Sequence, residues 1–445
     1  MRLRKLIILF SFFFFISAFF IFTPRVFATT FVADDILENT TWGLAGSPYV
    51  IQDDIMVNSG VILTIEPGVI VKVAPRDGGI NVLGTLFAEG TSDDHIYFTS
   101  LWDDSIGGDT NGDGNTTVPI VSQWNSKGLW YGCNFYFPEG VHLKNVDVSF
   151  STQGLNFWAT DASISNFRGR NNKVDLSIKA NSNINLSGGD FFGGLYGAIQ
   201  LMESSLIADN LQIEGVQQYE AIETEVSDLT LTDSTIQNLK NRTEAIGTEG
   251  PGIINFERVN LKNANNIVGY TGIEFNLKDS VLDSSYILTW GESTFNIDNS
   301  VIKNYHGHAI EDFNEGDTFN ITKSKIINND YGIYLYKDTN GFPPSVFNIS
   351  DTVISGNSQY GVYGLASYPI DFKNVWWGDT SGPYHDTLNP TGLGNAVSDN
   401  VLFDPWCKYE NCKAGFSNVL FYLVSKQVGC IHKEYWVRTD CGNRM

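Results

Sequence analysis

Hydrophobic and polar residues alternate along most of this chain in short runs that are separated by Gly, Asn, Asp and Ser. The clearest runs share one layout: an apolar pair, a polar kink, a second apolar pair, then usually Asn or Ser. They are LTLTDSTIQN (229–238), FERVNLKN (256–263), NLKDSVLDS (276–284), FNIDNSVIKN (295–304), FNITKSKIIN (319–328) and FNISDTVISG (347–356). Alternation with a period of two, bounded by turn residues, is typical of β-strands rather than helices.

The second apolar pair supplies one anchor residue per repeat. The anchors are Ile236, Leu261, Leu282, Ile302, Ile326 and Ile354, with Trp377 closing the series and Ile213 extending it backwards. Their successive spacings from Ile236 to Trp377 are 25, 21, 20, 24, 28 and 23 residues. Between them lie further short strands: EAIGT (244–248), HAIED (308–312), GIYLY (332–336) and GVYGL (361–365).

Strands this short become stable when each coil of the chain stacks on the previous one. The period therefore predicts an all-β fold, a single-stranded right-handed parallel β-helix with coils of about 20–28 residues and a cap at each end. We expect the anchor residues to form one buried ladder, and Asn to occupy left-handed turn positions. A leucine-rich repeat needs a Leu-x-x-Leu-x-Leu frame, which is missing.

Two segments carry a more specific resemblance. One is YVIQDDIMVNSGVILTIEPGVIVKV continuing to INVLGTLFAEGTSDDHIYFTS (49–100), and the other is NVWWGDTSGPYHDTLNPTGLGNAVSDNVLFDPW (374–406). With the coils between them, they make residues 41–406 resemble the secreted bacterial right-handed parallel β-helix proteins of the pectin-lyase-like superfold. In the second segment Trp376, Trp377 and Phe403 predict a C-terminal cap over 374–406, because an open β-helix end must be covered. The alternative is an aromatic carbohydrate platform.

The first 28 residues are typical of a signal peptide. Arg2, Arg4 and Lys5 precede the apolar run 6–22, and Val26-Phe27-Ala28 gives a signal-peptidase site. An uncleaved membrane anchor is the alternative, because the apolar run is nearly long enough to span a bilayer. Either reading predicts an extracytoplasmic, secreted or cell-surface protein, with no membrane association after cleavage.

Removal of residues 1–28 takes away 4 of the 28 basic residues and none of the 50 acidic ones, so the mature net charge is 24 minus 50, or −26. This charge argues against nucleic acid as a partner and favours cations. Four of the five cysteines lie in the tail 407–445, at 407, 412, 430 and 441, and three disulfide pairings are open there. The tail leaves the repeat and is interpreted as a remnant of a further, truncated domain.

An acidic loop, DDSIGGDTNGDGNTT (103–117), interrupts the early coils. Asp109, Asn111 and Asp113 alternate like the first half of an EF-hand calcium loop, and Gly114 permits its sharp turn. The match then fails, because the bidentate carboxylate position is Ile120. Asp103 and Asp104 are the local replacements, so these five residues predict a calcium site; a solvated acidic loop is the alternative.

Sugar-cleaving enzymes of the resembled superfold carry aspartates and His-Gly and Arg-x-Lys signatures on consecutive coils. The nearest match here is His306-Gly307-His308 with Asp312, as weak catalytic or metal-binding candidates, but no Arg-x-Lys follows. The first hypothesis is therefore a structural, adhesive or glycan-binding role with an extracellular polysaccharide as partner. The alternative is a polysaccharide lyase or glycoside hydrolase, which a cluster of three acids with one raised pKa in a groove would favour.

Overall fold

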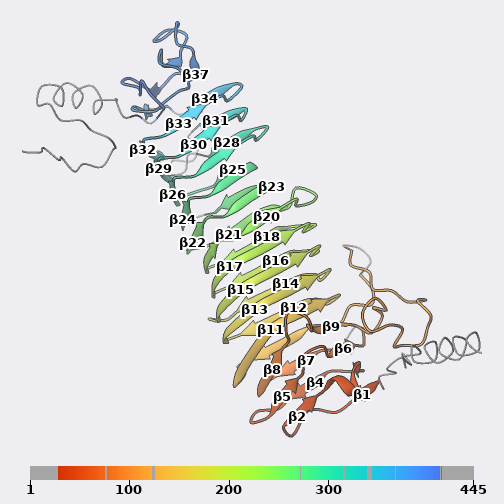
Figure 1. The fold of residues 1–445 in the computed structure, drawn as a ribbon. Helices are drawn as coiled ribbons and strands as arrows, with labels where there is room; N and C mark the ends of the chain where they lie inside the picture. The colour runs from red at the N-terminus through yellow and green to blue at the C-terminus, as the bar shows by residue number, and fades with distance from the viewer. Residues whose placement is uncertain are drawn as a thin grey trace, which may run out of the picture.

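The computed structural model describes residues 29–410 and 412, except 76–77, 123–125, 271, 314–315, 338–342 and 366. The chain forms an elongated stack of coils, with the N-terminal coils at one end and the C-terminal coils at the other (Figure 1). A 34-stranded, continuously paired sheet winds around the stack, and every strand pair in it is parallel. The predicted parallel β-helix is confirmed.

Each coil contributes to three sheet faces, which we name A, B and C. Face A contains β2 (Thr40–Trp42), β5 (Ile62–Ile65), β8 (Thr85–Glu89), the first halves of β11 (Gly140–Ser149), β13 (Asp161–Arg170), β15 (Asn183–Phe192) and β17 (Ser205–Glu214), then β19 (Asp228–Thr232), β22 (Gly252–Glu257), β24 (Ile273–Lys278), β26 (Thr294–Asp298), β29 (Thr318–Thr322) and β32 (Val346–Ser350).

Face B contains β1 (Thr30–Val32), β3 (Tyr49–Ile51), β6 (Ile70–Val73), β9 (Ile96–Ser100), the second halves of β11, β13, β15 and β17, then β20 (Thr235–Gln237), the first halves of β23 (Asn260–Gly269) and β25 (Val281–Thr289), β27 (Val301–Lys303), β30 (Lys325–Ile327) and β33 (Val353–Ser355).

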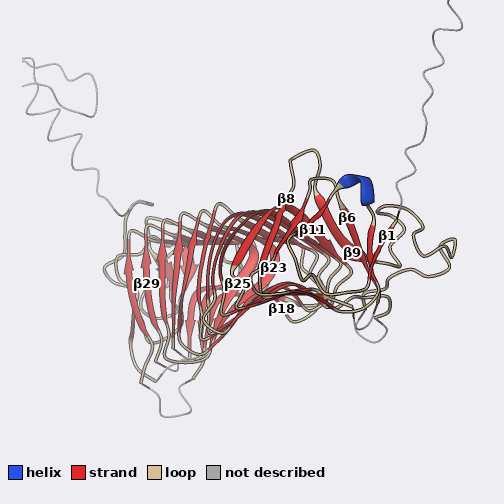
Figure 2. Cartoon of the chain, turned by 90° about the horizontal axis from the view of Figure 1, so that it is seen from below, coloured by secondary structure: helices blue, strands red, loops and turns tan. Residues whose placement is uncertain are grey.

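Face C contains β4 (Ile55–Val57), β7 (Ile80–Val82), β10 (Cys133–Tyr136), β12 (Gln153–Trp158), β14 (Val174–Lys179), β16 (Gly197–Met202), β18 (Glu220–Glu225), β21 (Glu244–Glu249), the second halves of β23 and β25, β28 (His308–Asp312), β31 (Tyr331–Leu335) and β34 (Tyr360–Gly364). In Figure 2 the strands of successive coils lie side by side around a common interior.

The interior is filled by ladders of apolar side chains, one per inward position. The anchor series from Ile236 to Ile354 forms one such ladder on face B, because each anchor is the register partner of the next. All six side chains are at most 1% exposed. The register that the repeat predicts is therefore correct, and Ile213 extends it backwards as expected.

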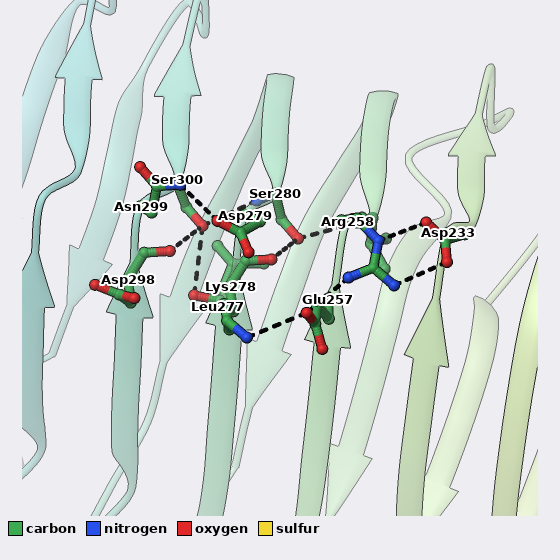
Figure 3. A network of polar contacts seen from close by, with 11 residues as sticks. Asp233, Glu257, Arg258, Leu277, Lys278, Asp279, Ser280, Asp298, Asn299 and Ser300 are labelled. Atoms are coloured by element: carbon green, nitrogen blue, oxygen red, sulfur yellow. Dashed lines mark hydrogen bonds and ion pairs between the residues drawn. The ribbon is translucent and has the colours of Figure 1, made fainter.

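Polar residues turn the chain at the corner between faces A and B (Figure 3). Asn299 and Arg258 hold the left-handed backbone there, with φ of 47° and 56°. Ser280 and Ser300 donate to carbonyls two residues back, and the Ser300 hydroxyl accepts the Ser280 N–H at 3.1 Å. Charged side chains cover the outside of the same corner, where the Arg258 guanidinium bonds Asp233 and Glu257.

Beyond β34 the chain crosses the end of the stack through β35 (Ile370–Asp371), β36 (Pro383–Tyr384), β37 (Gly394–Ala396) and β38 (Val401–Leu402). Trp377 and Phe403 are buried and Trp376 is half-buried. At the opposite end lies a short 3-10 helix, η1 (Leu44–Gly46).

Of the four tail cysteines, Cys407 and Cys412 form a disulfide. The predicted signal peptide, residues 1–28, lies outside the described residues, as do Cys430 and Cys441. Within the part of the chain that is described, no helix has the length and apolarity needed to cross a membrane.

Candidate functional site

Aromatic rings gather on the outside of face C in the last coils. We name this set the ring strip: Tyr286, Trp290, Tyr305, His308, Phe313, Tyr331, Tyr334, Tyr336, Tyr360 and Tyr363. All are half-buried or exposed, so each ring offers surface to solvent. The ring strip follows β25, β28, β31 and β34, whose strands are hydrogen-bonded neighbours.

The rings stack from coil to coil in columns. One column runs from Trp290 to Phe313 and Tyr336, with ring centroids 4.2 and 4.5 Å apart and nearly parallel planes. Another places His308 on Tyr334 at 4.0 Å and Tyr334 near Tyr363 at 5.3 Å. Offset and parallel contacts of this kind fix ring orientation and contribute about 0.5–1.5 kcal/mol each beyond burial.

The alignment of the rings follows from strand register. Tyr331 pairs with Tyr360 and Tyr334 with Tyr363, because both coils carry the same Tyr-Gly-x-Tyr pattern. The glycines of this pattern are buried at a bend where a neighbouring backbone or ring comes close. Sequence reasoning did not identify the ring strip, although this repeated pattern was the signal that marks it.

A histidine and a carboxylate lie within the ring strip. Glu311 accepts a hydrogen bond from the Tyr336 hydroxyl at 2.8 Å, and its Oε1 lies 3.4 Å from His308 Nδ1. Burial raises the pKa of Glu311, but the hydrogen bonds from His308 and Tyr336 outweigh it and hold the pKa below its usual value. Glu311 is therefore a fixed anion among the rings.

A group of carboxylates continues face C towards the N-terminus. We name Glu220, Glu223, Glu244 and Glu249 of β18 and β21 the glutamate cluster. Gly247 sits on the outer side of β21, where a Cβ would lie only 2.4 Å from Glu220 Cγ, so the Glu220 side chain folds across this glycine. Burial and the charges of Glu223 and Glu244 raise the pKa of Glu220 to about 7, and burial raises that of Glu244.

The three catalytic candidates from the sequence are separated in the structure. His306 lies in the turn before β28 with its side chain 98% exposed, and its only charged neighbour in the described chain is Asp330 at 3.8 Å. His308 is part of the ring strip. Asp312 is fully buried on the inner side of β28, where it neighbours Asp317, and does not reach the outer surface. His306 and His308 therefore do not lie on one strand face, because the strand begins only at His308.

The acidic loop brings together three of its five predicted ligands. Ligand atoms of Asp104, Asp109 and Asp113 all lie within 4.8 Å of one another. Both carboxylate oxygens of Asp104 are shielded from solvent and have no hydrogen-bond partner. Burial, and then the charge of Asp109, raise the pKa of Asp104.

The other two predicted ligands, Asp103 and Asn111, make hydrogen bonds to protein groups. Asp103 accepts hydrogen bonds from Thr99 and Ser105, and its carbonyl binds the buried Lys72 ammonium. The Asn111 amide donates to Asp113 and Thr117. Asp109 accepts the N–H groups of Gly112, Asp113 and Gly114, so the loop has the turn that calcium loops use.

A groove of about 760 Å³ lies at the end of face A, between β32 and residues 368–374. Its charged lining residues, Asp371 and Lys373, pair with each other at 3.0 Å. The groove therefore has no unpaired charged side chain among its described lining residues. The candidate binding groups lie instead on face C and in the acidic loop.

Comparisons with known proteins give three matches. A family model described as "Periplasmic copper-binding protein (NosD)" matches residues 263–417, about a third of the chain. Protein bark beetle of Drosophila melanogaster is 37% identical over 106 residues, which are 22% of this chain and only 3% of that protein. Two crystal structures of the periplasmic alginate epimerase AlgG, one of them a mutant, align over 82% of this chain and 84% of theirs. Their identities are 10% and 11% and their TM-scores 0.35 and 0.30.

Proposed function

We propose that this chain is an extracytoplasmic β-helix protein that binds a polysaccharide along the ring strip of face C. The observation that carries this proposal is the stacking of exposed rings from coil to coil, because a sugar ring packs its apolar face on an aromatic ring while its hydroxyls stay in water. The match to a periplasmic family over residues 263–417, which contains the whole ring strip, supports the location.

Length favours a polymer over a small ligand. From β25 to β34 the ring strip spans three coil steps, which at about 4.8 Å per step gives roughly 14 Å. The tyrosine hydroxyls and Glu311 offer hydrogen bonds between the rings. The strip therefore has both contacts that orient a sugar chain: an apolar platform and convergent polar groups.

The test is binding to a panel of soluble neutral and charged polysaccharides by affinity electrophoresis. Tyr334→Ala should weaken binding about tenfold, because an interface tyrosine typically contributes more than 1 kcal/mol. Phe192→Ala is the matched control, since Phe192 is an exposed aromatic residue of β15 that is not part of the ring strip. Retention of every polysaccharide by Tyr334→Ala, or binding of none by the unmodified protein, would refute the proposal.

We also propose that the acidic loop binds calcium through Asp104, Asp109 and Asp113. The unpartnered oxygens of Asp104 support it, because a buried anion without a donor is costly unless a cation neutralises it. Millimolar calcium should then raise the melting temperature by mass action. Asp104→Asn and Asp113→Ala should remove the increase, and Asp93→Asn, in a distant exposed turn, should retain it. An unchanged melting temperature with no calorimetric heat would exclude the site.

A further inference from the structure

The glutamate cluster forms no ion pair within the described residues, and its one cationic neighbour is Lys179. The glutamates that form ion pairs are Glu257, Glu311 and Glu410, and none belongs to the cluster. Glu223 accepts a hydrogen bond from Gln200 and lies near Lys179, whereas Glu220 and Glu244 are register partners on adjacent coils, and Glu249 is exposed at the end of β21. Carboxylates that lie close together in partly buried positions repel one another, which is unfavourable. A bound cation would reduce this repulsion.

A buried amide beside the cluster also lacks a partner. Asn266 is 3% exposed, and its Nδ2 donates to Glu244 Oε1 at 3.5 Å. In this orientation its Oδ1 has no hydrogen-bond donor. A buried acceptor without a donor typically costs about 1–3 kcal/mol. The Glu244 carboxylate and Asn266 Oδ1 are acceptors on adjacent groups, one charged and one neutral. They match a ligand with a positively charged nitrogen that carries several N–H donors.

The shape of the cluster favours an ammonium group over a metal ion. Within the described residues, the only group of three acidic, His or Cys ligands within 4.8 Å is the one in the acidic loop. The four glutamates are therefore too dispersed to close on a compact divalent ion. They suit protonated amines spaced along a chain.

The cluster and the ring strip are one continuous surface. Tyr286 stacks on Tyr305 at 4.5 Å, and its register partner Asn266 donates to Glu244, so this tyrosine links the ring strip to the cluster. Tyr270 is 41% exposed, and its pKa is raised by burial and then by the charges of Glu244, Glu220 and Glu249. From β18 to β34 the surface covers six coil steps, or roughly 29 Å.

We propose that the polysaccharide carries amino sugars, and that its protonated amines bind the glutamate cluster while neighbouring sugar rings pack on the ring strip. This inference rests on the proposed glycan binding and adds the chemical class of the ligand. The net charge of −22 is consistent with it, because a polyuronate would be repelled and a cationic polymer attracted.

The experiment compares two hexasaccharides that differ only at the nitrogen: glucosamine hexamer and N-acetylglucosamine hexamer. Titration calorimetry at physiological ionic strength, with the amines protonated, should give roughly tenfold tighter binding of the glucosamine hexamer. Glu220→Gln and Glu249→Gln should each remove most of this preference and leave binding of the acetylated hexamer unchanged. Glu89→Gln, an exposed glutamate on face A, should retain the preference and so controls for net charge.

The remaining outcomes separate the two proposals. Equal affinity for both hexasaccharides, with both weakened by Tyr334→Ala, would overturn the amine inference and leave glycan binding intact. Binding of neither would overturn glycan binding itself. If a lysine hexapeptide bound as tightly as the glucosamine hexamer, and Tyr334→Ala did not weaken its binding, the surface would be a general cation-binding surface. If the protein cleaved the glucosamine hexamer and Glu220→Gln abolished the cleavage, the cluster would be a catalytic site. Either result would overturn the inference.

Discussion

Faces A and C of the same coils carry opposite kinds of outer surface. On face A, asparagines occupy the same outward position on five successive coils, and each amide Nδ2 donates to the Oδ1 of the previous asparagine. The bonds measure 2.9, 2.7, 2.7 and 2.8 Å and join Asn255, Asn276, Asn296, Asn320 and Asn348. On face C, the equivalent coils carry stacked rings and carboxylates.

The difference lies in where the polar groups find partners. The asparagine ladder satisfies its own donors and acceptors, and such chains polarise one another, so face A stabilises the stack and leaves little for a ligand. Face C leaves ring faces open to solvent, and its glutamate cluster forms no ion pair in the described part of the chain. The two faces thus share one repeating backbone and differ in their outward side chains. Those of face A contribute to stability, and those of face C form the proposed binding surface.

The largest expected effect concerns the interior that both faces share. Ile302→Asp should destabilise the protein by about 4 kcal/mol or more, because an unpaired charge would enter the inner ladder. Ile207→Asp, at a position that is 55% exposed on face A, should change stability by less than about 0.5 kcal/mol. Urea unfolding followed by circular dichroism measures both. Similar losses in the two variants would contradict the inward and outward assignment.

The second prediction concerns the corner between faces C and A, where Asp317 is buried beside Asp312. Burial and the charge of Asp312 raise the pKa of Asp317 from 3.8 to about 8. The folded protein then holds a proton that the unfolded chain releases. This contribution to stability is complete below about pH 4 and is lost as pH rises through about 8.

Unfolding free energy should therefore fall by a few kcal/mol across that window. Asp317→Asn should flatten most of the decline, whereas Asp175 and Glu220, whose pKa values burial raises to about 7, should contribute to the remaining slope. Urea midpoints at a series of pH values test this. An identical slope in the variant and the unmodified protein would show that Asp317 does not carry the proton.

The third prediction targets the asparagine ladder alone. Asn296→Ala should cost about 1–3 kcal/mol, because it removes two hydrogen bonds and leaves Asn276 Oδ1 without its donor and Asn320 Nδ2 without its acceptor. Glycan binding should be unchanged. Asn185→Ala, on face A but with no side-chain hydrogen bond in the described structure, should be nearly neutral. A loss of binding in Asn296→Ala would mean that the two faces are not independent.

The smallest expected effect on stability comes from removing a ring of face C. Tyr334→Ala should lower the unfolding free energy by about 1–2 kcal/mol, because it removes the stacking of this half-buried ring on His308 and Tyr363. Its affinity for glycan should nevertheless fall as proposed above. Thermal unfolding and binding assays on one preparation give both values. A large loss of stability would assign the rings a structural role like that of the asparagines.

Sequence reasoning predicted the interior well because inward residues obey a strict rule. One apolar residue per coil must stack on its equivalents, so a slip of one position would place a charged residue inside. The turns at Asn238, Asn263, Asn304 and Asn328 were also predictable, since each has the left-handed φ that asparagine tolerates.

The ring strip and the glutamate cluster were harder to predict. Tyr286, Tyr305 and His308 come together across turns of different length, so no fixed spacing aligns them. The coil EAIGT was identified as a strand, but its Gly247 and the distance to Glu220 give no hint that the glutamate folds across the glycine. Outward positions obey no burial rule, and their contacts depend on the conformation of each turn.

The matching coils at 331–336 and 360–365 have a consequence for how this surface can change. Because each coil binds its neighbours in one register, insertion of a further copy of a Tyr-Gly-x-Tyr coil would preserve the inner ladder and add one more row of rings. Each coil added or removed would change the length of the ring strip by about 4.8 Å. The length of polymer that we propose this surface binds would therefore change in whole steps, through duplication or deletion of coils, with no change of fold.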